Sequence, residues 1–427
     1  MSSDGRVGGR RDGGEELTVQ LGDISPAGTR HMWQRSAVAL ADELAVVGAA
    51  GRLRGVDVNS GAERWSTDLD TEYVVSLATD PAGEAIFAGC RGENGAVAAV
   101  DAASGDVLWT YRTAADLGSP QKESLFFLPY VVDVAGDGER FYAAARRYER
   151  GGADAAASGD DGVRTFRSAV YAFDPDGSVA WTYRADASTI ALDLREGRVA
   201  AAYNRCPGDH QCGMVVLDAA TGDARLTWDP GTEGQRRVGD AALLDDGGVA
   251  VASHGDYRGY RLDERGGIEW SVDLARPTRI GGETLYAYPN HVRATDDTIA
   301  FVTGNTYPEE GREAEGRHPD EHSIAVFDAD GIPRWRASVG GWVSELAAAG
   351  DRIATPCAQH FRDRDPGAHG LQLFGLREGS VDEVGLDGVG TACALDEERV
   401  AVIEEPVEYH DGDAVRGSHR VRVLPRQ

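Results

Sequence analysis

One short motif recurs along this chain and limits what the chain can fold into. An apolar run ends in an aspartate, a glycine follows three or four residues later, and a tryptophan stands four residues beyond that glycine. The clean copies end at Trp65, Trp109, Trp181, Trp270 and Trp335. A sixth copy, with Asp218 and Gly222, has Leu226 at the tryptophan position. An apolar strand that ends in such a turn and is followed by a second strand is a β-hairpin. The motif therefore predicts hairpins that each bury a large side chain at one fixed depth.

Two more short strands with alternating apolar residues precede each hairpin. Residues 38–40 with 44–48 form one such pair, and residues 190–194 with 199–203 form another. Four antiparallel strands that recur every 35 to 60 residues or so are the signature of a propeller blade. The units are expected to begin near Val38, Val75, Val131, Ile190, Ala241, Val292, Leu346 and Ala392.

The two ends of the chain complete one another in this scheme. The last unit stops after three strands, at residues 420–424, while residues 16–21 align with the fourth strands and have Leu17 in the place of the tryptophan. We therefore predict an all-β fold: an eight-bladed β-propeller of four-stranded antiparallel blades, closed by the N-terminal strand that completes the last blade. Residues 15–427 form this single domain, and residues 1–14 are expected to be a disordered tail. Seven blades remain an alternative, because no tryptophan follows Gly379 in the seventh unit.

The repeat, over roughly residues 17–424, resembles that of the pyrroloquinoline-quinone-like (PQQ-like) propellers. That family includes quinoprotein alcohol dehydrogenases and the propeller lipoprotein that assists outer-membrane protein assembly. The resemblance implies a fold more than a function, because the same repeat serves enzymes, scaffolds and sensors. The family's enzymes bind PQQ and calcium in the channel, under a disulfide between adjacent cysteines. No two of the five cysteines here are adjacent, so we expect neither PQQ nor calcium, and no other cofactor.

The charge of the chain is strongly acidic. Aspartate and glutamate number 71 against 43 basic residues, for a formal net charge of −28, and Lys122 is the only lysine. An even acidic excess is typical of a surface adapted to a very salty cytosol, where salt screens the repulsion between carboxylates. An acidic site for a basic partner is the alternative, although such sites usually form blocks. Nucleic-acid binding is disfavoured, because acidic residues surround the basic pairs at 146–147 and 236–237.

The sequence also bears on location and metals. No stretch is long enough to span a membrane, and no apolar segment follows Arg10 and Arg11 as an export signal would require. We expect a cytoplasmic monomer. Cys206 and Cys212 stand close in sequence, with His210 between them. A zinc site would need further ligands, so we expect a structural pair or an optional disulfide, and no metal.

The extra length of the chain falls mainly on one face of the expected propeller. The segments between second and third strands are long at residues 146–167, 205–212, 305–321, 358–370 and 404–418, whereas the opposite face has tight turns. Long loops on one face of a rigid scaffold usually mark its working surface, and neutral insertion is the alternative. On that face, residues 123–129 and 283–289 have similar sequences in two expected links between blades.

These patterns give a set of candidate binding residues near the channel mouth. They are Trp33, Glu123, Phe127, Glu283, Tyr288, His291, Trp342 and His360. An aromatic rim suits a peptide or ligand, although the same rings could pack beneath their own loops. The function predicted is a non-catalytic binding or scaffold protein that engages a protein partner through the loop-rich face. A channel-site enzyme (a quinoprotein-like oxidoreductase or a hydrolase) and a small-ligand sensor are the alternatives.

Overall fold

The structure is a computed structural model, and its secondary structure is almost entirely strand. It describes residues 16–28, 34–122, 124, 126–150, 164–295, 297–311, 314–358, 360, 362, 364–379, 381–409 and 414–426. Within these ranges the helices are α1 (Ala114–Leu117) and the 3-10 turn Pro366–Ala368. No helix in the described part is long and apolar enough to cross a membrane. The all-β prediction is confirmed.

Four consecutive antiparallel strands make up most of the sheets. The first has the order β2 (Ser36–Ala41), β3 (Leu44–Ala49), β4 (Arg52–Asp57), β5 (Glu63–Asp68). Another has the order β14 (Ser188–Arg195), β15 (Arg198–Arg205), β16 (Met214–Asp218), β17 (Ala224–Trp228). Next comes β18 (Val238–Leu243), β19 (Val249–Ser253), β20 (Arg258–Leu262), β21 (Ile268–Asp273). A fourth has the order β27 (Ala347–Ala349), β28 (Arg352–Cys357), β29 (Gly370–Gly375), β30 (Val381–Gly385).

Two larger sheets contain the same unit with additions. One consists of β6 (Tyr73–Thr79), β7 (Ala85–Arg91), β8 (Ala96–Asp101) and β9 (Val107–Arg112) together with β10 (Tyr130–Gly136), β11 (Phe141–Arg150), β12 (Arg164–Phe173) and β13 (Val179–Ala185). A single pair, Tyr130 with Arg91, joins its two halves. The other adds β22 (Thr278–Ile280) to β23 (Glu283–Ala294), β24 (Thr298–Pro308), β25 (Ser323–Asp328) and β26 (Pro333–Ser338).

One sheet combines the two ends of the chain. Strand β1 (Leu17–Gln20) lies beside β33 (Arg420–Pro425), followed by β32 (Arg399–Glu405) and β31 (Val389–Leu395). The pairing is antiparallel and sets Leu17 opposite Val423 and Gln20 opposite Arg420. This is the pairing that the sequence predicted for these two segments.

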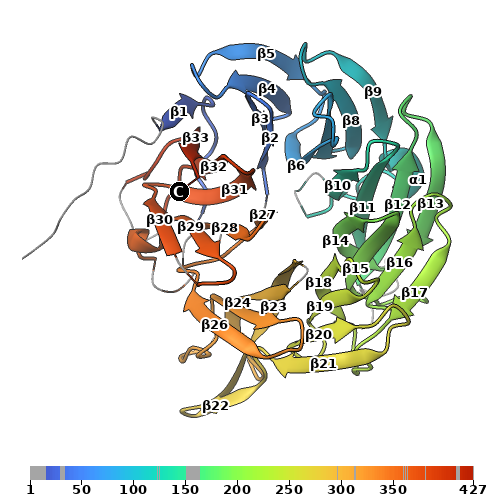
Figure 1. Ribbon diagram of the computed structural model, residues 1–427, viewed down its shortest axis with the longest axis vertical. Helices are drawn as coiled ribbons and strands as arrows, with labels where there is room; N and C mark the ends of the chain where they lie inside the picture. Colours follow the sequence, from blue (N-terminus) through green and yellow to red (C-terminus); the bar gives the residue numbers. More distant parts are fainter. Residues whose placement is uncertain are drawn as a thin grey trace, which may run out of the picture.

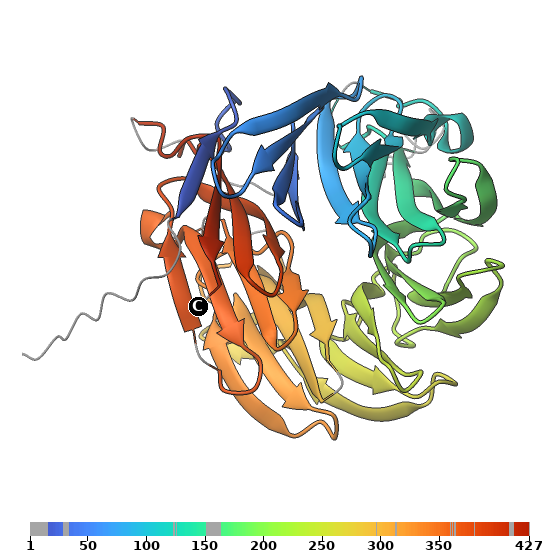
Figure 2. The same ribbon diagram turned by 45° about the horizontal axis from the view of Figure 1, so that its top comes forward.

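The sheets follow one another in chain order around a central axis, as Figures 1 and 2 show. The first strand of each unit lies nearest the axis, and the neighbouring first strands β2, β6, β10, β14, β18 and β23 contact one another in succession. Strand β31 contacts β2, which brings the last unit beside the first. The arrangement is that of a β-propeller.

Each of the five recurrent tryptophans joins its unit to the next one. Trp65 is 8% exposed, and its indole N–H donates to the carbonyl oxygen of Ala102 in the following unit, at 2.9 Å. Its ring covers Gly105, which has a φ of +77°, and a Cβ there would lie 2.6 Å from the indole. Trp109, Trp181, Trp270 and Trp335 make the same kind of bond, to the carbonyls of Pro175, Ala219, Ala329 and Leu376. Glycine is required in these turns because only glycine combines a positive φ with room for the ring.

Two leucines replace tryptophan in this role. The side chain of Leu226 covers Gly266, and that of Leu17 covers Gly61. Both leucines stand at the tryptophan position of the sequence motif.

The prediction of a link at residues 283–289 is wrong. These residues begin β23, which pairs with an extension of β24 so that Leu285 faces Pro308. The segment Leu285-Tyr286-Ala287-Tyr288 alternates buried and half-buried side chains with a period of two, which suits a strand. The expected insertion after Asn305 is therefore partly strand, because β24 continues to Pro308 beside the start of β23. Strand β22, which pairs with the same part of β23, lies at the lower edge of Figure 1.

Candidate functional site

A β-bulge recurs at equivalent points of the innermost strands. The register shifts at Val75, Val132, Ile190, Gly239, Asn290 and Thr391. A bulge bends its strand and re-aims the neighbouring side chains. The innermost strand is also an edge strand of its unit, so alternate backbone N–H groups face the axis and are available to side chains from the adjacent unit.

Carboxylates from neighbouring units accept these N–H groups. Asp133 accepts from the N–H of Leu192 at 3.4 Å, and Asp193 accepts from that of Leu243 at 2.6 Å. The same relation joins Asp240 to Val292 at 2.9 Å and Glu345 to Cys393 at 3.2 Å. Each acid thus bridges one unit to the next, so the acids near the axis have a structural role whatever else they do.

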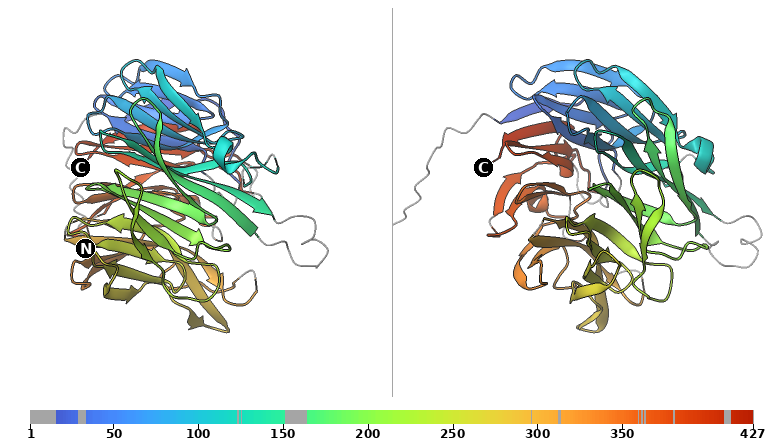
Figure 3. Two further views of the ribbon diagram at one scale, coloured as in Figure 1. Left: turned by 90° about the vertical axis from the view of Figure 1, so that its right-hand side faces the viewer. Right: turned by 45° about the vertical axis from the view of Figure 1, so that its right-hand side comes forward.

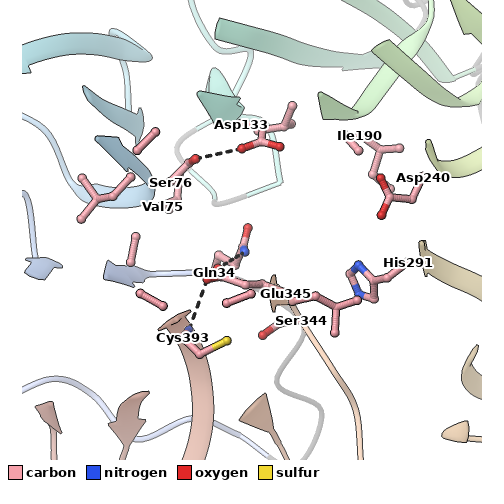
Figure 4. Close-up of a pocket in the computed structure, with 18 of the residues that line it drawn as sticks. Gln34, Val75, Ser76, Asp133, Ile190, Asp240, His291, Ser344, Glu345 and Cys393 are labelled. Atoms are coloured by element: carbon pink, nitrogen blue, oxygen red, sulfur yellow. Dashed lines mark hydrogen bonds between the residues drawn. The ribbon is translucent and has the colours of Figure 1, made fainter. Parts of the chain in front are cut away.

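The inner strands enclose a cavity of about 500 Å³. Figure 4 shows Asp133, Asp240, His291 and Glu345 around it. Its polar lining includes Gln34, Ser76, Arg91, Tyr130, Asp133, Arg146, Asp240, His254, Asn290, His291, Arg293, Ser344 and Glu345. Ser76 donates to Asp133 at 3.2 Å, and Gln34 donates to Glu345 at 3.1 Å. A lining with both signs of charge suits a polar ligand.

Arg293 is the cation that lies among the carboxylates near the axis. Its guanidinium lies 3.0 Å from the carboxylate of Asp240. Burial opposes its charge, but the carboxylates of Asp240, Asp193 and Asp133 raise the pKa of Arg293 above its usual value. Burial raises the pKa of Asp133 to about 6 and that of Glu345 to about 8. At neutral pH Glu345 is therefore largely protonated.

The raised pKa of Glu345 makes stability depend on pH. Between the ordinary value of 4.5 and about 8, the folded protein keeps a proton that the unfolded chain has released. This group's contribution to the free energy of unfolding therefore falls as pH rises through that interval, by on the order of 4 kcal/mol in all. We expect Glu345→Gln to remove this fall, so that the variant gains stability relative to wild type from pH 5 to pH 8.

Urea unfolding at several pH values measures the effect. Glu383→Gln, in an exposed residue of β30, is the matched control and should follow the wild-type profile. Parallel pH profiles for Glu345→Gln and wild type would contradict the prediction.

Aromatic side chains gather beside the cavity on the face where second strands end. Tyr257, Tyr286, Tyr288 and Tyr307 form one cluster with ring centroids 4.7 to 6.0 Å apart. The guanidinium of Arg236 lies 4.8 Å from the Tyr288 ring. Tyr288 also contacts His254, a residue of the cavity lining, at 4.8 Å. Burial, and then the charge of Arg236, lower the pKa of His254 to about 3, so this imidazole is neutral.

The structure brings three of the candidate residues to this region. His291 and Trp342 line the cavity, and Tyr288 lies in the adjoining tyrosine cluster. The His291 ring is 3.1 Å from the carbonyl oxygen of Val343, and burial lowers its pKa.

The other described candidates lie elsewhere. Phe127 is 8% exposed and packs with Tyr148 and Phe166 beneath its own loop. Glu283 accepts the backbone N–H groups of Glu315 and Gly316, which ties down a loop. Trp33 and Glu123 fall outside the described residues.

His360 belongs to a separate buried cluster. Its ring nitrogen lies 3.4 Å from the carboxylate of Glu321, and its ring is 4.8 Å from that of His322. Although burial opposes it, hydrogen bonding from His360 lowers the pKa of Glu321 to about 2.

Metal-binding side chains do not converge in the described part of the chain. No group of three or more histidine, cysteine, aspartate or glutamate side chains there is placed to hold a metal ion. Cys206 and Cys212 are free thiols, and the Cys206 sulfur contacts the backbone oxygen of Cys212 at 3.5 Å.

Comparison of the sequence with known protein families gives one match. The family model described as outer membrane protein assembly factor BamB matches residues 4–146 and 93–284, and the two overlapping matches together cover well over half of the chain. The chain belongs to this family. The resemblance inferred from the sequence repeat is thereby confirmed. No curated protein matches the sequence significantly.

Solved structures of other propellers share the fold of this BamB-family chain. BamB from Moraxella catarrhalis is 15% identical with a TM-score of 0.53, covering 96% of this chain and 98% of that one. Sqt1 from Saccharomyces cerevisiae is 12% identical with a TM-score of 0.61, covering 97% and 100%. Quinohemoprotein alcohol dehydrogenase from Comamonas testosteroni is 11% identical with a TM-score of 0.58, covering 97% and 76%. At such identities the likeness shows the fold alone.

Proposed function

We propose that this chain is a non-catalytic binding protein that engages a protein partner through its loop-rich face. The half-buried tyrosine cluster with Arg236 is the observation that carries the proposal. Tyrosine and arginine are enriched among the residues that dominate binding at protein interfaces, because each combines a large contact area with polar groups. The proposal requires neither a cofactor nor a metal, and it treats the protein as a monomer.

Long hairpins on the same face support the proposal. Strands β23 and β24 have 12 and 11 residues, and β11 and β12 have 10 each, whereas β19 and β20 have 5. Figure 3 shows the green ends of strands β11 and β12 extending beyond the body on one side of the molecule. A rigid sheet extended beyond the body presents a partner with pre-organised backbone, which lowers the entropic cost of binding.

We also propose that the propeller has eight blades and that β1 closes the ring by completing the last blade. The pairing of β1 with β33 supports this count, as does the position of Leu17 over Gly61, which repeats the contact of each tryptophan with the next unit. A closed ring would hold the binding face rigid.

Capture of a partner under native salt tests the proposed function. In concentrated KCl, the tagged wild-type protein is expected to retain a partner protein from its own cell extract in a stoichiometric amount. The variant Tyr286→Ser/Arg236→Ser should lower the affinity of the purified pair at least about tenfold, because it removes two side chains of the hot-spot type.

The control lies on the opposite face. Ile332, in the turn before β26, is 60% exposed, and Ile332→Ser should leave the affinity unchanged. Equal loss of binding in both variants, or none in the tyrosine variant, would contradict the proposal.

A further inference from the structure

Several arginines in this protein face an acidic residue across a pair of neighbouring strands. Arg52 in β4 lies opposite Asp68 in β5, with their charged groups 3.6 Å apart. Arg258 in β20 lies opposite Asp273 in β21, with their charged groups 2.9 Å apart. Directly opposite positions bring two side chains to the same face of a sheet, where opposite charges attract and like charges repel. Such pairing is expected in a chain with 71 acidic and 43 basic residues.

Arginine faces arginine instead at two neighbouring places on the loop-rich face. Arg150, the last residue of β11, lies opposite Arg164, the first residue of β12. Arg205, the last residue of β15, lies opposite Arg236 in an isolated antiparallel bridge. In the described part of the chain, none of these four side chains has a hydrogen-bond acceptor or an ion-paired carboxylate. Each pair therefore brings two positive charges together without an acid between them.

The two pairs form one group of charges. Burial, and then the charges of Arg236 and Arg164, lower the pKa of Arg205 to about 10. Tyr288 and Tyr148 act in the opposite sense, and Arg205 remains a cation at neutral pH. The guanidinium of Arg236 lies 4.8 Å from the Tyr288 ring, so the group borders the tyrosine cluster. Figure 1 shows β11, β12 and β15 close together on one side of the propeller.

This group is incomplete without an anion. Arg205 and Arg236 are half-buried, and Arg164 is exposed. A half-buried cation loses part of its hydration, and here no ion pair compensates for that loss. A carboxylate from outside would supply the pair, because the planar guanidinium group binds carboxylates through two parallel N–H bonds. Partial burial also reduces the screening of such a pair by salt.

We propose that Arg164, Arg205 and Arg236, beside Tyr288, bind an acidic segment of the protein partner. The proposal rests on the binding function stated above and specifies the chemistry of the partner. Carboxylates of the segment pair with the guanidinium groups, and its other side chains lie against the neighbouring tyrosines. The net charge of −28 repels an acidic segment from the rest of the molecule, so the attraction is local and orients the partner.

A nucleic acid suits this group less well than an acidic segment does. It has a phosphate at every nucleotide, and it would extend past these few arginines over a molecule whose net charge is −28. A short acidic segment makes its contacts within the group.

Fluorescence anisotropy with the purified full chain tests the proposal. The probe is fluorescein-labelled hexaglutamate, and hexaglutamine with the same label is the uncharged control. We expect saturable binding of hexaglutamate alone, and we expect it to persist in concentrated KCl. Arg205→Gln should weaken this binding at least about tenfold, as expected for loss of a charge-assisted hydrogen bond. Arg265→Gln makes the same change of charge in a turn on the opposite face, where the side chain is 86% exposed, and should bind as wild type does.

Thermal melting without the probe checks that the variants fold. Arg205→Gln should melt at or above the wild-type temperature, because its side chain has no ion pair or hydrogen bond in the described part of the chain to lose. Arg164→Gln changes an exposed side chain, so it should fold in any case. It should weaken hexaglutamate binding about threefold, as expected for an exposed ion pair.

The outcomes distinguish failure of this proposal from failure of the binding function. Suppose that a partner is captured and that Tyr286→Ser/Arg236→Ser weakens its binding. If Arg205→Gln then binds that partner as wild type does, the acidic segment is wrong and the binding function stands. Binding of hexaglutamate that depends on Arg205, with no partner captured, would support the acidic site and count against the binding function.

Two results with the probes would overturn the proposal by themselves. The first is absence of hexaglutamate binding, or equal binding by folded Arg205→Gln. The second is tighter binding of a fluorescein-labelled single-stranded oligothymidylate with the same dependence on Arg205, which would assign the group to nucleic acid.

Discussion

Replacing Trp65 by alanine is expected to lower the free energy of unfolding by about 3 to 5 kcal/mol. The indole is 8% exposed and lies between two adjacent sheets, so its removal leaves a cavity that neither sheet can fill. The bond from its N–H to Ala102 is lost as well, and the carbonyl is left in a site shielded from water. Urea unfolding followed by circular dichroism measures the change.

Two milder variants at the same position separate packing from hydrogen bonding. Trp65→Phe keeps a ring over Gly105 but loses the N–H donor, at a cost of about 1 kcal/mol. Trp65→Leu should cost less than alanine does, because Leu226 already covers Gly266 in the same way. If leucine and alanine proved equally destabilising, the ring would not act as a packing wedge between the sheets.

The fold was predictable because its determinants are local in sequence. An aspartate turn, a glycine with positive φ and a large side chain four residues later are all visible in one short window. The structure adds the reason for the spacing: the side chain covers the glycine of the next unit, as Trp65 covers Gly105. The same rule found Leu17 and Leu226, where the residue type differs but the position is kept.

The site was less predictable because it depends on register between strands. The bulges fall at residue types as different as Val75, Gly239 and Thr391, so no residue type marks them, and the re-aimed Asp240 could not be distinguished from surface aspartates. The adjacent pair Arg146 and Arg147 looked like one basic patch. In the strand they point to opposite sides: Arg146 lines the cavity, and Arg147 pairs with Glu149.

The sequence identified aromatic residues as candidates, but it did not show whether each side chain is exposed or buried. Tyr288 and Phe127 occupied similar sequence patterns. Tyr288 lies within a long strand and is half-buried, whereas Phe127 lies in a turn and is buried against Tyr148. The two differ because β23 extends back to Glu283, through residues whose sequence predicts a link between blades.

Removal of the Asp240 carboxylate should be the most damaging change near the axis. Asp240 is 4% exposed and accepts from Arg293 and from the N–H groups of Ala241 and Val292. Asp240→Ala leaves all three donors in a buried site, so we expect a loss of about 3 to 5 kcal/mol in the free energy of unfolding. Asp245→Ala is the matched control beyond the end of the same strand. Its pair with Arg195 is partly exposed and should contribute at most about 1 kcal/mol.

Asp240→Asn separates the two roles of this side chain, which accepts the N–H of Val292 and carries the charge beside Arg293. The amide oxygen can still accept the N–H of Val292, which preserves the bridge between units, but the charge beside Arg293 is gone. If the bridge dominates, asparagine should recover most of the stability that alanine loses. If the charge dominates, asparagine should resemble alanine, because Arg293 is then left with Asp133 and Asp193, whose pKa values burial already raises. Loss of less than about 1 kcal/mol in Asp240→Ala would contradict both, and would mean that water replaces the carboxylate in the cavity.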